Sequence, residues 1–75
     1  MKRIYTLCVF VAEDGDEGIA AFYDPRTQTH IPMVAADEAR VDSLRPIAQQ
    51  IASASGCTIR LFRFQVREML EEITP

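Results

Sequence analysis

The chain has 75 residues, 48% of them hydrophobic and 25% charged, and this length leaves room for one domain spanning residues 1–75. Its formal net charge is −3, and its one lysine and seven arginines are scattered rather than clustered. Because neutralising phosphates requires clustered basic residues, we expect no nucleic-acid binding.

The first element in the chain is a predicted strand over residues 4–12. This stretch is rich in β-branched and aromatic side chains, and it is too short for a stable helix. Its two basic residues followed by an apolar run imitate a secretory signal, but Phe10 stands where the cleavage pattern requires a small side chain. No stretch approaches the roughly 18–20 apolar residues of a membrane span. We therefore expect a cytoplasmic protein with no membrane partner.

An acidic stretch, EDGDEG over residues 13–18, follows the first strand. It offers no frame with the alternating oxygen ligands and the closing acid of a calcium loop. Asp14 and Gly15 are instead a preferred pair for a two-residue type I′ turn. This turn predicts a hairpin with a second strand over residues 18–23, and it sets Val11 opposite Gly18.

A third strand is predicted over residues 31–35, after the turn residues DPRTQTH. Pro32 cannot donate a ladder hydrogen bond, so it belongs at a sheet edge or at the beginning of a strand.

A helical period begins after Asp37, which is a good N-cap, and it stops before Gly56. The apolar residues that recur at this spacing are Val41, Leu44, Ala48, Ile51 and Ala52. Pro46 interrupts the pattern, so we expect a short first turn over 38–44 that runs into a main helix over 44–55. A later start capped by Ser43 is the alternative, since Pro46 would then lie in the first turn.

Two elements are predicted after Gly56. Residues 57–64, CTIRLFRF, form a strand, and residues 66–73 form a short C-terminal helix with an apolar stripe at i, i+3, i+4 and i+7. The stripe consists of Val66, Met69, Leu70 and Ile73. Because a helix of two turns is marginal alone, it must dock on another surface.

The predicted order β-β-β-α-β-α indicates an α+β two-layer sandwich with a mostly antiparallel sheet of three or four strands. The fourth strand follows a helical crossover, so it lies either parallel to the third strand or beside the first.

Catalytic and metal-binding patterns are lacking. His30 is the sole histidine, the serines lack a nucleophile-elbow pattern, and the three glycines are too far apart to cradle a phosphate. Cys8 and Cys57 are interpreted as buried, reduced thiols, with a bridge as the alternative if their strands are neighbours. We expect no enzyme, no catalytic residue, no metal and no cofactor.

The arginines near the end of the chain provide one candidate site. Arg60, Arg63 and Arg67, together with His30, could contact an anion or an acidic partner. This predicts a small-molecule or anion-binding domain as one alternative function. Ion pairing with nearby glutamates is the simpler interpretation.

Two segments resemble the HicB antitoxin family, VFVAEDGDEGIAAFYDP and ADEARVDSLRPIAQQIA. The matching positions are Asp14, Gly15, Gly18, Ala20, Asp24, Pro25, Glu38 and Ala39. The family's Leu-Pro-Gly-Cys turn is missing, and CTIRLFRF is not the expected continuation, so the likeness covers about half of the chain. The resemblance implies, as a second alternative, an antitoxin-like partner protein.

The number of apolar side chains exceeds what one small sandwich can bury. We therefore expect a non-catalytic interaction or regulatory module that binds itself, as a homodimer, or another protein. The expected interface residues are Val66, Met69, Leu70 and Ile73.

Overall fold

The computed structural model describes residues 3–75, and it contains six strands and one helix within that range. In chain order these elements are β1 (Leu7–Asp14), β2 (Asp16–Ile19), β3 (Ala21–Asp24), β4 (Thr29–Pro32), β5 (Val34–Ala35), α1 (Glu38–Ser55) and β6 (Thr58–Phe64).

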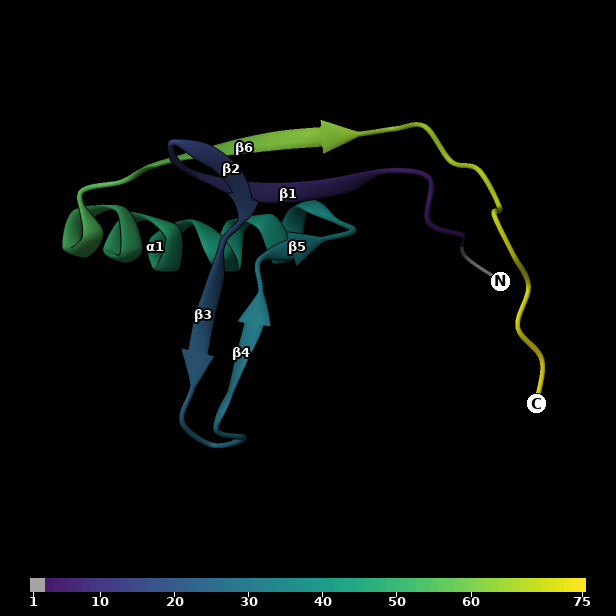
Figure 1. The fold of residues 1–75 in the computed structure, drawn as a ribbon, viewed down its shortest axis with the longest axis horizontal. Coiled ribbons are helices and arrows are strands. Elements are labelled where there is room, and N and C mark those ends of the chain that lie inside the picture. The colour runs from purple at the N-terminus through teal and green to yellow at the C-terminus, as the bar shows by residue number, and fades with distance from the viewer. Residues whose placement is uncertain (1–2) are drawn as a thin grey trace.

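The main sheet is built around β1, and every pairing in it is antiparallel (Figure 1). Strand β6 pairs with β1 along nearly its whole length, from Leu7 opposite Phe64 to Glu13 opposite Thr58. The other edge of β1 is shared by two strands. Strand β2 pairs with the last residues of β1, and β5 pairs with Cys8 and Val9 of β1. The expected α+β fold with a mostly antiparallel sheet and one main helix is confirmed. The fourth predicted strand lies beside the first.

The hairpin between β1 and β2 has a different register from the predicted one. Val11 lies opposite Ile19, and Asp14 lies opposite Asp16, so Gly15 alone occupies the tip. Gly15 has φ +82°, a left-handed conformation that a residue without a Cβ adopts at little cost. The turn was correctly placed, but its length was wrong by one residue, which shifts every pair along the ladder.

The predicted second and third strands are each divided in two, because the chain leaves the sheet between them. A separate hairpin, β3 paired with β4, projects from the body as an arm (Figure 1). Three backbone hydrogen bonds close its base: Phe10 N–H donates to Met33 O at 3.0 Å, Met33 N–H to Ala20 O at 2.8 Å, and Ala20 N–H to Phe10 O at 2.8 Å. Phe10 thus hydrogen-bonds to the residue before β3 and to the residue after β4, where the chain enters and leaves the arm. Pro32 is the last residue of β4.

The arm ends in a turn organised by Asp24. Its side-chain oxygen accepts a hydrogen bond from Arg26 N–H at 3.0 Å, and its carbonyl accepts one from Gln28 N–H at 2.8 Å. Gln28 takes a positive φ of 57° to complete the turn. The turn chemistry predicted for this stretch is therefore present.

Helix α1 is continuous from Glu38 to Ser55, so the division into a short turn and a later helix, and the alternative start at Ser43, are both wrong. The predicted ends are correct: Asp37 accepts a hydrogen bond from Arg40 N–H at 2.8 Å, and Gly56 closes the helix with φ 75°. Pro46 lies inside the helix and is exposed. Proline lacks the N–H that would donate the next backbone hydrogen bond of the helix. Burial of Val41, Leu44 and Ala48 on the other side stabilises the helix despite this loss.

Replacing Asp37 by alanine removes the N-cap acceptor and is expected to lower the free energy of unfolding by about 0.5–2 kcal/mol. Asp42→Ala is the matched control, because Asp42 contacts Arg45 on the exposed side of the same helix and should change stability by less than about 0.5 kcal/mol. Urea unfolding followed by circular dichroism measures both. Equal losses in the two variants would contradict the assigned cap.

The core lies between α1 and one face of the sheet. Met33, Leu44 and Val41 are its largest fully buried side chains, and Cys8 and Phe10 reach them from β1. Phe22, at the base of the arm, packs against the edge of this cluster. The main buried cluster thus lies between one helix and one face of the sheet.

The predicted C-terminal helix is absent from this structure. Residues 65–75 form neither helix nor strand and lead away from the body (Figure 1). A helix of about eight residues falls below the roughly 12–15 at which an isolated helix becomes marginally stable, so it needs a surface to dock on. The apolar stripe finds no such surface here.

Both cysteines are free; Cys8 is buried, whereas Cys57 is half-buried and so departs from the prediction. Cys8 pairs with Arg63, and Cys57 precedes the other end of β6, about 20 Å away at ~3.3 Å per residue. The alternative of a bridge between them is therefore wrong. Within residues 3–75, no helix combines the length and the apolar composition that crossing a membrane requires.

Candidate interaction surface

The face of the sheet opposite α1 is the main candidate surface. Side chains alternate along a strand, so Cys8, Phe10 and Ala12 point toward the helix and their neighbours point away from it. The ladder pairs then place residues of four strands beside one another. We call this surface the open face; its apolar residues are Leu7, Val9, Val11, Ile19, Val34, Phe62 and Phe64.

The open face is apolar at its centre and exposed around it. Val9 and Val11 are buried, since strands flank them on both sides, but Phe62 is 39% exposed and Phe64 54%. The helix of the described chain lies on the opposite side, where its buried residues contact Phe10. The large side chains of β6 therefore remain in contact with solvent.

The total surface of the chain is larger than a self-contained domain needs. Its accessible area is 6331 Å². A folded monomer of the same 8.5 kDa mass exposes about 4,650 Å². The radius of gyration is 14.2 Å, whereas a compact domain of this length has about 11 Å. Roughly 1,700 Å² more surface is thus exposed than in a compact monomer of this mass, and the exposed residues 65–75, which lie off the body, contribute to this surplus.

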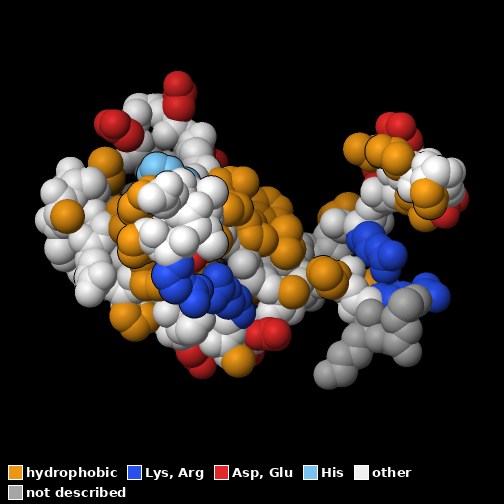
Figure 2. Space-filling model, turned by 90° about the horizontal axis from the view of Figure 1, so that it is seen from below, with side chains coloured by type: hydrophobic (Ala, Val, Ile, Leu, Met, Phe, Trp, Pro, Cys, Tyr) orange, Lys and Arg blue, Asp and Glu red, His pale blue; other side chains and the backbone are white. Residues whose placement is uncertain are grey.

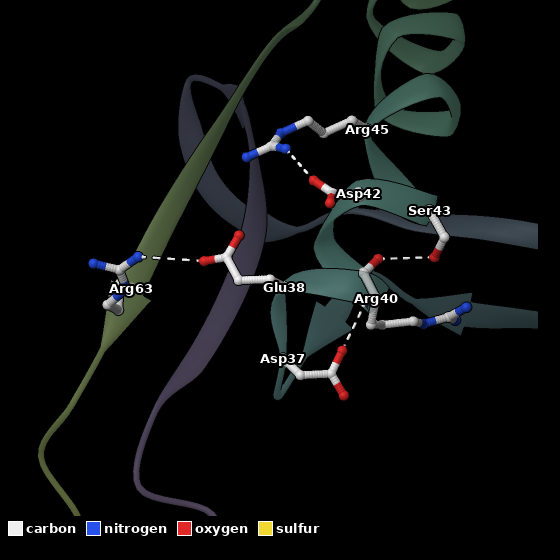
Figure 3. Close-up of polar contacts among 7 residues, drawn as sticks. All are labelled: Asp37, Glu38, Arg40, Asp42, Ser43, Arg45 and Arg63. Carbon is white, nitrogen blue, oxygen red and sulfur yellow. Dashed lines mark hydrogen bonds and ion pairs between the residues drawn. The ribbon is translucent and has the colours of Figure 1, made fainter.

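Arg60 and Arg63 point to opposite sides of β6, as the strand alternation predicts. Arg60 lies on the open face and forms an ion pair with Glu13 of β1. Arg63 lies on the helix side, where its Nη2 is 3.8 Å from Oε1 of Glu38 (Figure 3). The two guanidinium groups are therefore not brought together, and each has an acidic neighbour.

Arg67 follows β6 and stacks its guanidinium on the ring of Tyr5, 5.2 Å from the ring centre. A groove of about 200 Å³ lies at this junction, lined by Ile4, Tyr5, Thr6, Leu7, Phe64, Val66 and Arg67. The groove continues the open face toward the C-terminal residues. Arg67 thus contacts the residues before β1 at the point where the chain leaves β6.

His30 lies on the arm, far along the chain from the three arginines. Its ring is 5.4 Å from that of Tyr23 on β3, centre to centre, at an angle of 58°. Both side chains are exposed. The anion site predicted from His30 and the three arginines remains a prediction, and the structure places its members in separate surroundings.

The predicted interface residues are almost fully exposed. Val66 is 95% exposed and Leu70 87%, and Met69 and Ile73 are similarly open to solvent. Among the described residues, no group of three or more His, Cys, Asp or Glu side chains is arranged to hold a metal ion. A hollow of about 370 Å³ lies on the surface between residues 3–6 and the residues just before α1.

Ile19 and Val34 are members of the open face that the sequence did not reveal. The one-residue shift of the first hairpin and the break at Met33 decide which way each points. Strand alternation alone places Leu7 with Val9 on one side of the first strand, and Phe62 with Phe64 on one side of the last. Compared with family models, curated proteins and solved structures, the chain has no match.

Proposed function

We propose that this protein is a small, non-catalytic interaction or regulatory module of the cytoplasm, and that it acts by binding a protein on its open face. The observation that carries the proposal is the apolar sheet face left uncovered by α1, with Phe62 and Phe64 in contact with solvent. Exposed apolar patches of this kind are typical of protein interfaces.

The excess accessible area supports the same function. Specific protein complexes bury about 800 Å² on each partner, and the surplus of this chain exceeds that value. Aromatic side chains contribute disproportionately to such interfaces, and β6 presents two of them. The alternative of an anion-binding domain has weaker support, because Arg60, Arg63 and Arg67 already contact side chains of this chain.

Phe62→Glu tests the proposal by placing a charge on the solvent-exposed part of the open face, on β6. We expect the wild-type protein, gently purified and examined by native mass spectrometry and light scattering, to form a complex that Phe62→Glu weakens at least ~10-fold. Gln50→Glu adds the same charge on the exposed side of α1 and should leave the complex intact. A wild-type chain without any partner, or a complex indifferent to Phe62→Glu, would overturn the proposal.

A further inference from the structure

We propose that the partner is a second copy of this chain, and that each copy lays residues 66–73 across the open face of the other as a helix that forms on docking. We call residues 66–73 the C-terminal segment. This inference rests on the proposed function and names the occupant of its surface.

The first support is the pattern of the C-terminal segment. Val66, Met69, Leu70 and Ile73 fall on one side only when the segment is helical, with Glu68, Glu71 and Glu72 on the other. In the single chain the segment is not helical, and Figure 2 shows it apart from the body, with hydrophobic and acidic side chains exposed together. Its apolar side therefore matches a surface that the single chain does not offer it.

The second support is that the segment cannot readily return to its own sheet. A single residue, Gln65, separates the end of β6 from Val66. Strand-to-helix connections that reverse the chain take about 2–6 residues. After β6 the chain passes the end of the sheet and then bends away from the strand direction (Figure 1), and the Arg67 guanidinium lies over the Tyr5 ring at this point. The open face of another molecule is reachable along that course.

The third support is the amount of surface involved. Permanent homodimers bury about 1,000–2,500 Å² on each chain. The surplus of roughly 1,700 Å² falls within this range. A second copy supplies both missing parts at once, since it carries one open face and one C-terminal segment. The two contacts are then equivalent about a two-fold axis, as expected for a closed homodimer.

Two full-length variants test the exchange. Phe62→Glu damages the open face, and Leu70→Glu damages the segment. Each substitution alone is expected to raise the dissociation constant of the dimer at least ~10-fold, as measured by sedimentation. The control Gln50→Glu is expected to leave this dissociation constant unchanged. Mixing the two damaged variants should give a mixed dimer tighter than either variant's own dimer, because the intact segment of one fits the intact face of the other and only the reciprocal contact carries the two substitutions. Mixed dimers that form no better than either variant's own dimer would overturn the exchange.

The connection provides a second test that does not damage the interface. Inserting four glycine and serine residues after Gln65 should let the segment reach its own sheet and convert the dimer to a monomer. Hydrogen exchange should then show protected amides in the segment of both the wild-type dimer and the inserted monomer. An inserted chain that remains dimeric would contradict the inference.

The outcomes separate this inference from the proposed function. A dimer broken by Phe62→Glu but not by Leu70→Glu retains the open face as an interface and rejects exchange. A chain that is monomeric alone yet binds a different protein through Phe62 likewise rejects the second copy and retains the interaction module. A complex that Phe62→Glu does not weaken rejects both the exchange dimer and the proposed binding of a protein on the open face.

Discussion

Leu44→Ala is expected to leave the protein largely unfolded in dilute solution. Leu44 is fully buried at the centre of α1, and its removal leaves a cavity between the helix and the sheet. Such a change costs about 2–5 kcal/mol. The whole margin of a single core of this size is about 3–5 kcal/mol. The predicted loss is thus comparable with the total stability.

Circular dichroism with increasing urea measures this loss, and Gln49→Ala is the control. Gln49 lies on the exposed side of the same helix and donates only to Ser53, so its replacement should shift the free energy of unfolding by less than about 0.5 kcal/mol. A Leu44→Ala protein as stable as this control would mean that the helix does not pack on the sheet as described.

Stability is also expected to depend on protein concentration, because a dimer that dissociates on unfolding is favoured by mass action. Raising the protein concentration 100-fold should increase the apparent free energy of unfolding by about 2.7 kcal/mol per mole of dimer. Urea or thermal midpoints at the two concentrations measure the shift.

Phe62→Glu provides the control for this dependence. Its midpoint should rise less with concentration than that of the wild type, because the variant associates at least ~10-fold more weakly. A wild-type midpoint that does not move with concentration would contradict self-association. It would leave the binding of a different protein on the open face as the remaining form of the proposal.

Signals carried by neighbouring residues made most of the helix and the strands predictable. Asp37 and Gly56 define the ends of α1 through hydrogen bonds to residues within four positions, so the sequence alone contains that information. The apolar period of α1 outweighs Pro46, which local rules treat as a boundary. Tertiary packing overrides local preference at this proline.

Pairings between distant residues were not predictable in the same way. The division of the second strand at Ala20 depends on hydrogen bonds to Phe10 and Met33, and no local pattern marks it. The C-terminal helix was wrongly predicted: its apolar residues follow a helical period, but a segment of about eight residues is too short to form a stable helix by itself. The odd spacing of Arg60 and Arg63 is enough to place them on opposite sides of β6, but their acidic neighbours, Glu13 and Glu38, are set by the fold.

The junction at Phe10 makes the arm a module whose length can change without disturbing the body. Its base is closed by the three hydrogen bonds among Phe10, Ala20 and Met33, and its tip is a local turn. Adding or removing a pair of residues in both β3 and β4 preserves the side-chain alternation and leaves those three bonds in place. A variant with a longer or shorter arm can therefore keep the same body, provided that Phe22 keeps its place against the core.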